Sequence, residues 1–192
     1  MTKTNILLFS YGIELSLPLL HSTLGGPPVS CLGQAYLPNF SFNWAHSSGL
    51  PTLKSKRSSK TIGAITSLSV QQFQRLILIR SGIYVAKSCI VYPVSNKPLS
   101  FSKNSPLSFL QRPLSFSKLT SPILRSPIVC QCLFPAITTP STSIPGTPHP
   151  WAWRETIAGA HSRQLPDQWI QRLEAITPVY SQKSYSYSYS NS

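Results

Sequence analysis

Acidic residues are scarce in this chain of 192 residues. It has four Asp and Glu residues against 17 Lys and Arg residues, for a formal net charge of +13. The acids lie near the two ends of the chain: Glu14, Glu155, Asp167 and Glu174. Soluble domains usually carry both signs of charge over their surface, with about 25% charged residues against 11% here. The long acid-free centre therefore argues against an ordinary charge-balanced globular domain.

Long apolar segments are also missing. A membrane-spanning helix needs about 18 or more predominantly apolar residues in a row. The best stretch, Ile6–Leu20, is interrupted by Glu14 and Pro18, which argues against a span there. The same region has the outline of a targeting signal, with Lys3 before the apolar residues and small residues after them, but Glu14 weakens that pattern.

The cysteines and glycines lack the spacing that marks familiar sites. The four cysteines, Cys31, Cys89, Cys130 and Cys132, are too scattered for a disulfide framework. Only one cysteine pair is close, and His149 and His161 lie far from it and from each other, so we predict no zinc site. There is no nucleophile-elbow motif and no glycine-rich phosphate loop. The sequence therefore predicts no cofactor, no metal site, no small-molecule substrate and no enzymatic activity.

Regular secondary-structure patterns are short. Prolines number 18, and those between residues 95 and 150 exclude helix interiors and central strands there. The hydrophobic fraction, 41%, is nevertheless too high for simple disorder. We predict a mostly irregular or disordered chain without a globular fold. It has isolated short helices at about 65–80 and 166–177 and one or two short strands at about 83–92.

Composition divides the chain into five segments. Residues 1–53 are an irregular apolar segment with a possible targeting signal, and 54–94 combine a basic cluster with the helix-like and strand-like patterns. Residues 95–150 are a Ser/Pro-rich low-complexity linker in which PLSF occurs three times. Residues 151–180 form a small helical segment, and 181–192 are a Ser-Tyr tail.

A basic cluster is the first candidate binding feature. It consists of Lys54, Lys56, Arg57 and Lys60 in the stretch KSKRSSK. Such a cluster is typical of a nuclear-import signal or a weak, non-specific contact with nucleic acid or an anionic membrane. A solvated basic loop is the simpler alternative, and both interpretations stay open.

An amphipathic helix near the C-terminus is the second candidate binding feature. Trp169, Leu173 and Ile176 share one face of the segment that opens at Pro166 and ends before Pro178. This face could dock into a groove of a partner protein. The alternative is a local helix that covers a small core of the chain itself.

These observations support no assignable biochemical activity. The sequence favours a non-enzymatic chain and is compatible with the product of a dubious or recently arisen open reading frame. A first alternative is a basic Ser/Pro-rich interaction protein that binds nucleic acid or a partner. A second is a small secreted or membrane-associated protein. The partner is unknown, and the basic composition favours the nucleus or an organelle over secretion without deciding the location.

Overall fold

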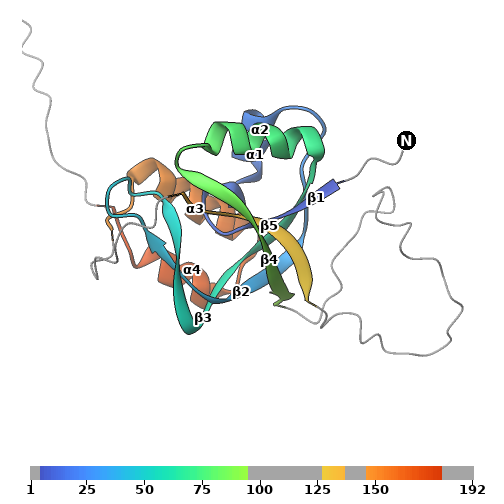
Figure 1. Cartoon of the computed structure of the whole chain (residues 1–192). Coiled ribbons are helices and arrows are strands. Elements are labelled where there is room, and N and C mark those ends of the chain that lie inside the picture. Colours follow the sequence, from blue (N-terminus) through green and yellow to red (C-terminus); the bar gives the residue numbers. More distant parts are fainter. Residues whose placement is uncertain (1–4, 95–126, 137–145, 179–192) are drawn as a thin grey trace, which may run out of the picture.

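A computed structural model describes residues 5–94, 127–136 and 146–178 of the chain. These residues form five strands, four α-helices and one short 3₁₀ helix, η1 (Figure 1). The strands are β1 (Asn5–Ser10), β2 (Ser30–Trp44), β3 (Pro51–Ser69), β4 (Tyr84–Pro93) and β5 (Ile128–Pro135). The helices are η1 (Ile13–Leu15), α1 (Leu17–Leu24), α2 (Val70–Arg80), α3 (Pro150–Ser162) and α4 (Asp167–Glu174).

The five strands close into a barrel in the order β1-β3-β2-β4-β5 (Figure 1). Strand β1 pairs antiparallel with β3 and parallel with β5, where Leu8 lies opposite Gln131 and Phe9 opposite Cys132. Closure removes the open edges that a flat sheet would expose. The barrel therefore joins segments that are more than a hundred residues apart in the chain.

Strands β2 and β3 form a long antiparallel hairpin with an irregularity near its middle. Their register shifts between Pro38 and Phe40, and residues 56–59 of β3 lie opposite no residue of β2 in the paired register. Asn39 and Ser58 both adopt a φ of 62° at this point, and the Ser58 N–H donates to the Asn39 side-chain oxygen at 3.3 Å. Proline has no N–H for the ladder, so the shift begins where pairing is weakest.

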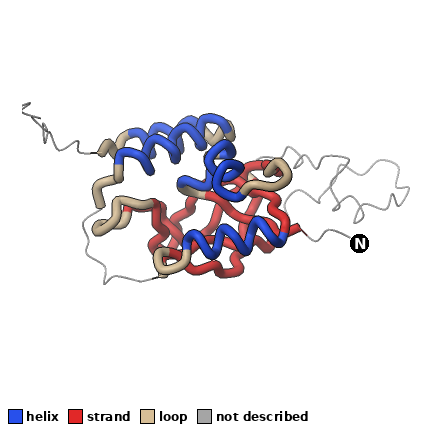
Figure 2. The backbone as a smooth tube through the Cα atoms, turned by 90° about the horizontal axis from the view of Figure 1, so that it is seen from above, coloured by secondary structure: helices blue, strands red, loops and turns tan. Residues whose placement is uncertain are grey.

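Helices cover the barrel on two sides (Figure 2). Helix α2 begins with a capping box in which the Ser69 hydroxyl accepts from the Gln72 N–H and the Gln72 side chain accepts from the Ser69 N–H. Helices α1 and α2 bury Leu20, Phe73 and Leu76 against β1 and β3. Helices α3 and α4 pack into the main core, which also contains most of the inward-facing side chains of the barrel.

This barrel overturns the prediction of a mostly irregular chain without a globular fold. The patterns in short windows failed because polar residues are buried inside the fold. Thr66 is fully buried on β3, and the buried Thr61 hydroxyl donates to the Phe40 carbonyl at 2.9 Å. A buried hydroxyl is tolerated when it has a hydrogen-bond partner, and that partner comes from the neighbouring strand. The helix expected at about 65–80 begins only at Val70, because residues 65–69 belong to β3.

The segments defined by composition meet in one core. Residues 1–53 supply β1 and β2, residues 54–94 supply most of β3 with α2 and β4, and residues 151–180 supply most of α3 and all of α4. The apolar stretch considered as a targeting signal contains β1. Strand β5 lies inside the predicted 95–150 linker. The rest of that linker at 95–126 and 137–145, and the Ser-Tyr tail at 181–192, lie outside the described residues.

Within the part of the chain that the structure describes, no helix has the length and apolar character needed to cross a membrane.

Candidate functional site

A tight turn after β1 holds the most unusual cluster of polar side chains. The turn runs from Tyr11 to Leu15 and includes η1, with the Leu15 N–H donating to the Gly12 carbonyl at 2.9 Å. A Cβ atom on Gly12 would lie 2.6 Å from the Cβ of Pro51 at the start of β3. Only glycine allows this close approach, and it brings the side chain of Glu14 beneath the end of α2.

Glu14 forms an ion pair with Arg80, the last residue of α2. The Arg80 Nε donates to Glu14 Oε1 at 3.1 Å. Burial raises the pKa of the Glu14 carboxyl above its ordinary value, and the nearby Arg80 guanidinium acts in the opposite direction. The two side chains keep 10% and 16% of their surface exposed, so the pair is partly desolvated but still in contact with solvent. Such a carboxylate is suited to move a proton.

Two tyrosines belong to the same cluster. The Tyr11 hydroxyl donates to the Leu133 carbonyl at 2.7 Å, and the Tyr84 hydroxyl donates to the Pro51 carbonyl at 2.6 Å. Burial raises the pKa of both phenols, and the negative charge of Glu14 raises the pKa of each further. Both tyrosines therefore stay neutral at physiological pH, and their hydrogen bonds hold the barrel strands in place around Glu14.

Helix α3 pins the turn from the other side. Arg163, at its end, is buried; its Nε donates to the Leu15 carbonyl at 2.9 Å and its Nη2 to the Thr66 hydroxyl at 3.2 Å. A Cβ on Gly159 would lie 2.6 Å from backbone atoms of Leu15 and Ser16, so α3 packs directly on η1. These contacts fix the backbone that carries Glu14.

The raised pKa of Glu14 predicts a pH-dependent contribution to stability. The folded protein binds the Glu14 proton more tightly than the unfolded chain does. The contribution of Glu14 is therefore most favourable below its ordinary pKa of 4.5 and falls as the pH rises through the raised value. We expect the free energy of unfolding of the wild type, relative to Glu14→Gln, to decrease as the pH rises above 4.5. Urea titrations at several pH values measure this difference. The control is Asp167→Asn at an exposed carboxyl; an equal or rising difference for Glu14→Gln would contradict the assignment.

The residues considered for metal binding do not converge. Among residues 5–94, 127–136 and 146–178, no group of three or more His, Cys, Asp or Glu side chains could hold a metal ion. Cys130 and Cys132 are buried on β5. His149 caps α3 by accepting from the Trp151 N–H, and His161 pairs with Glu174 on the surface at 2.8 Å.

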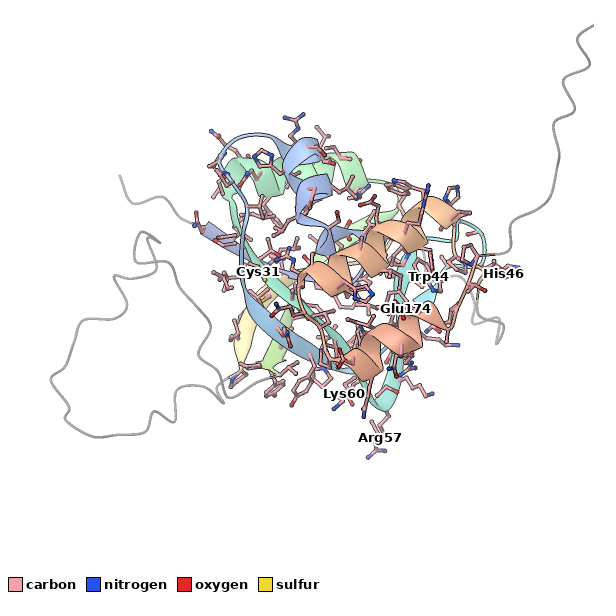
Figure 3. The ribbon with its side chains drawn as sticks, turned by 180° about the vertical axis from the view of Figure 1, so that it is seen from behind. Cys31, Trp44, His46, Arg57, Lys60 and Glu174 are labelled. Atoms are coloured by element: carbon pink, nitrogen blue, oxygen red, sulfur yellow. The ribbon has the colours of Figure 1, made fainter. Side chains whose placement is uncertain are left out.

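The structure places the basic cluster on the β2–β3 hairpin. Its members are Lys54, Lys56, Arg57 and Lys60. All are exposed on β3, and Figure 3 shows Arg57 and Lys60 at the bend of β3, where the register of the hairpin shifts. The Lys60 ammonium lies 5.8 Å from the centre of the Tyr36 ring, within the range of a cation–π contact. Binding of nucleic acid or an anionic membrane by this cluster stays a prediction.

The predicted docking face of the C-terminal helix is turned inward. Trp169 and Leu173 are only 5% and 1% exposed, and Ile176 packs against the same core. The Trp169 ring makes an edge contact with Phe42 of β2, with ring centres 6.3 Å apart. Of the two alternatives left open for this face, a partner protein or a core of the chain itself, the face therefore packs against the core of the same chain.

The polar cluster around Glu14 is not predictable from the motifs of the sequence. One signal was present: a single acid inside an apolar stretch, followed by a long chain without acids. It was interpreted as a defect in a targeting signal. Arg80 and Tyr84 carried no signal at all, because only the fold brings them to Glu14.

No family model matches the chain, and no curated protein matches it in sequence. Solved structures do match it. A γ-glutamyl cyclotransferase is 18% identical, with a TM-score of 0.68 over 94% of this chain and 93% of that protein. An uncharacterised protein from Homo sapiens is also 18% identical, with a TM-score of 0.66 over 93% and 92%. A protein from Arabidopsis thaliana is 14% identical, with a TM-score of 0.52 over 90% and 84%.

These likenesses correct three functional expectations. The chain is not a disordered low-complexity protein, and its interpretation as the product of a dubious or recently arisen open reading frame is wrong. The expectation of no enzymatic activity rested on missing catalytic and cofactor motifs, and the match to the fold of a γ-glutamyl cyclotransferase contradicts it. This chain has the fold of γ-glutamyl cyclotransferase.

Proposed function

We propose that this chain is an enzyme that cyclises γ-glutamyl groups, with the Glu14–Arg80 ion pair as its reactive centre. The observation that carries the proposal is this partly desolvated pair, held on the turn after β1 at 3.1 Å. The shared fold with a protein named γ-glutamyl cyclotransferase supports the choice of substrate class. Fold alone does not determine activity, so the proposal depends on the chemistry of the pair.

The pair is complementary to the head of a γ-glutamyl group. That head carries an ammonium and a carboxylate on one carbon atom, and the γ-carbonyl joins it to the amine that will leave. Arg80 offers a planar guanidinium, which matches a carboxylate well. Glu14 offers an acceptor for the ammonium. A bound substrate would thus exchange one ion pair for two, and it would place its nitrogen beside Glu14.

Glu14 then moves protons in both halves of the reaction. It takes a proton from the α-ammonium, and the free amine attacks the γ-carbonyl carbon. The new C–N bond closes a five-membered lactam, and the bond to the leaving nitrogen breaks. Glu14 returns its proton to the leaving nitrogen. The attacking nitrogen loses a second proton when the lactam forms, and the released amine takes up this proton to become an ammonium. No water is consumed, and the proton count balances.

The neighbouring groups position this carboxylate. Arg163 holds the Leu15 carbonyl, and Tyr84 ties β4 to Pro51, so the turn and the end of α2 keep a constant separation. Such preorganisation lowers the cost of reaching the reactive geometry.

The test is an assay with two isomeric dipeptides. The full-length chain is incubated with γ-glutamyl-alanine or with α-glutamyl-alanine, and mass spectrometry detects the lactam and free alanine. We expect both products from the γ-isomer and neither from the α-isomer. In the α-isomer the amide is formed by the α-carboxyl group, so attack of the amine on the amide carbon cannot close a five-membered ring. Absence of lactam from the γ-isomer, with circular dichroism showing a folded chain, would overturn the proposal.

A further inference from the structure

A groove opens where the barrel seam between β2 and β4 separates. These strands pair only at Ala35–Pro93 and Tyr36–Tyr92. Beyond this point β2 contains Pro38, which has no N–H to donate, and Asn39, whose φ is positive. The ladder stops there, and the strands leave a groove of about 490 Å³.

The walls of the groove are mainly apolar. Phe40 of β2 and Phe134 of β5 meet edge to face with ring centres 5.2 Å apart. Leu37, Leu53 and Pro135 extend this surface. One cation lies at the groove, because the Lys87 ammonium is 5.9 Å from the centre of the Phe134 ring. The groove therefore suits a small apolar molecule with a carbonyl oxygen that can face the Lys87 ammonium.

Cys89 brings a nucleophile to this surface. It lines the groove from β4 and is half-buried, whereas Cys130 and Cys132 are buried. The neighbouring Cys132 thiol lowers the pKa of Cys89, against the opposing effect of burial. Burial raises the pKa of Cys130 to about 12 and also raises that of Cys132. Among these three thiols, only Cys89 lines the groove, and only its pKa lies below the ordinary value.

We propose that Cys89 is a modification site for small apolar α,β-unsaturated carbonyl compounds that bind in the groove between β2 and β4. The Cys89 sulfur forms a bond to the β-carbon of the acceptor, and the electron pair of the carbon–carbon double bond moves toward the carbonyl. The α-carbon takes up the proton that the thiol loses. No group leaves, so the mass of the adduct is the sum of the two reactants. This inference does not depend on the proposed cyclase activity.

Cys31 serves as an internal control. It is also half-buried and reduced, but it does not line the groove. The full-length chain is treated with maleimide or with N-phenylmaleimide, and peptide mass spectrometry follows the rate at each cysteine. Dividing the rate at Cys89 by the rate at Cys31 removes the intrinsic reactivity of each reagent. We expect this ratio to exceed one for both reagents and to be about tenfold larger for N-phenylmaleimide, because its ring enters the apolar groove. Equal ratios for the two reagents, or faster reaction at Cys31, would overturn the proposal.

Two variants locate the effect in the groove. Ser55 is exposed and lines the groove, so Ser55→Trp should obstruct it and reduce the N-phenylmaleimide ratio toward the maleimide ratio. Phe134→Ala should remove the same preference by deleting one wall, and reaction at Cys31 should stay unchanged. An undiminished preference for N-phenylmaleimide in both variants would show that the groove does not select the reagent, and it would also overturn the proposal.

Discussion

Replacing Glu14 by glutamine is expected to lower the rate of lactam formation from γ-glutamyl-alanine by about a hundredfold or more. Glutamine keeps the size of the side chain and can still accept a hydrogen bond from Arg80, but it cannot take a proton from an ammonium. General acid–base catalysis contributes roughly 10²- to 10⁴-fold to a rate, and here one carboxylate serves as both base and acid. Initial rates at saturating substrate measure the loss directly.

A surface carboxylate provides the matched control for this variant. Glu174 is 42% exposed and pairs with His161 on the outside of the molecule. Glu174→Gln makes the same chemical change far from the turn after β1, and its rate should equal that of the wild type. The role of Glu14 would be rejected if Glu14→Gln retained the wild-type rate, or if both variants lost activity to the same extent.

The largest expected effect on stability comes from Gly63→Ala. Gly63 lies on β3 opposite Ala35 of β2, next to Ala64, which pairs with Ser10 at the end of β1. An added Cβ would collide with the backbone oxygen of Ser10 and would lie 2.9 Å from two atoms of the Phe9 ring. Backbone cannot move aside as a flexible side chain can, so the barrel must distort. We expect a loss of about 3 kcal/mol in the free energy of unfolding, which corresponds to a melting temperature lower by roughly 6 to 12 °C.

Gly82→Ala separates this collision from the general cost of replacing glycine. Gly82 has a φ of +85°, but nothing lies within 4 Å of the place that an added Cβ would take. Its replacement should cost about 1 kcal/mol, because only the backbone conformation is strained. Thermal unfolding of both variants tests the comparison. A Gly63→Ala protein as stable as Gly82→Ala would show that β1 and β3 are not in such close contact.

Local sequence patterns came nearest to the structure where an element depends on its own residues. Helix α4 lies inside the segment expected at 166–177, because Trp169 and Leu173 recur at helical spacing before Pro178. Strand β4 covers nearly the same residues as the expected strand at 83–92, which are rich in β-branched and aromatic side chains. What each element packs against was not available from these patterns, and so α4 was considered as a face for a partner.

The barrel itself could not be inferred in this way. Strands β2 and β3 contain many Ser, Thr, Lys and Pro residues, and no alternation of apolar and polar residues persists along them. Their pairing depends on a register shift at Pro38, and β5 stands in a segment dominated by proline and serine. Strand pairing over such distances is decided by the total burial that closure achieves, which no short window contains.

By itself, the sequence determined the charge of the molecule, the exposure of the basic residues around Arg57, and the approximate positions of α4 and β4. These properties follow from composition and from spacing within a few turns of chain. The tertiary structure alone decided that Glu14 meets Arg80, 66 residues away, and that Cys89 faces an open seam. Both arrangements result from closure of the barrel. Closure removes the Glu14 carboxylate from most of its contact with water, and it leaves β2 and β4 unpaired beside Cys89. The chemistry proposed for this chain depends on these two places.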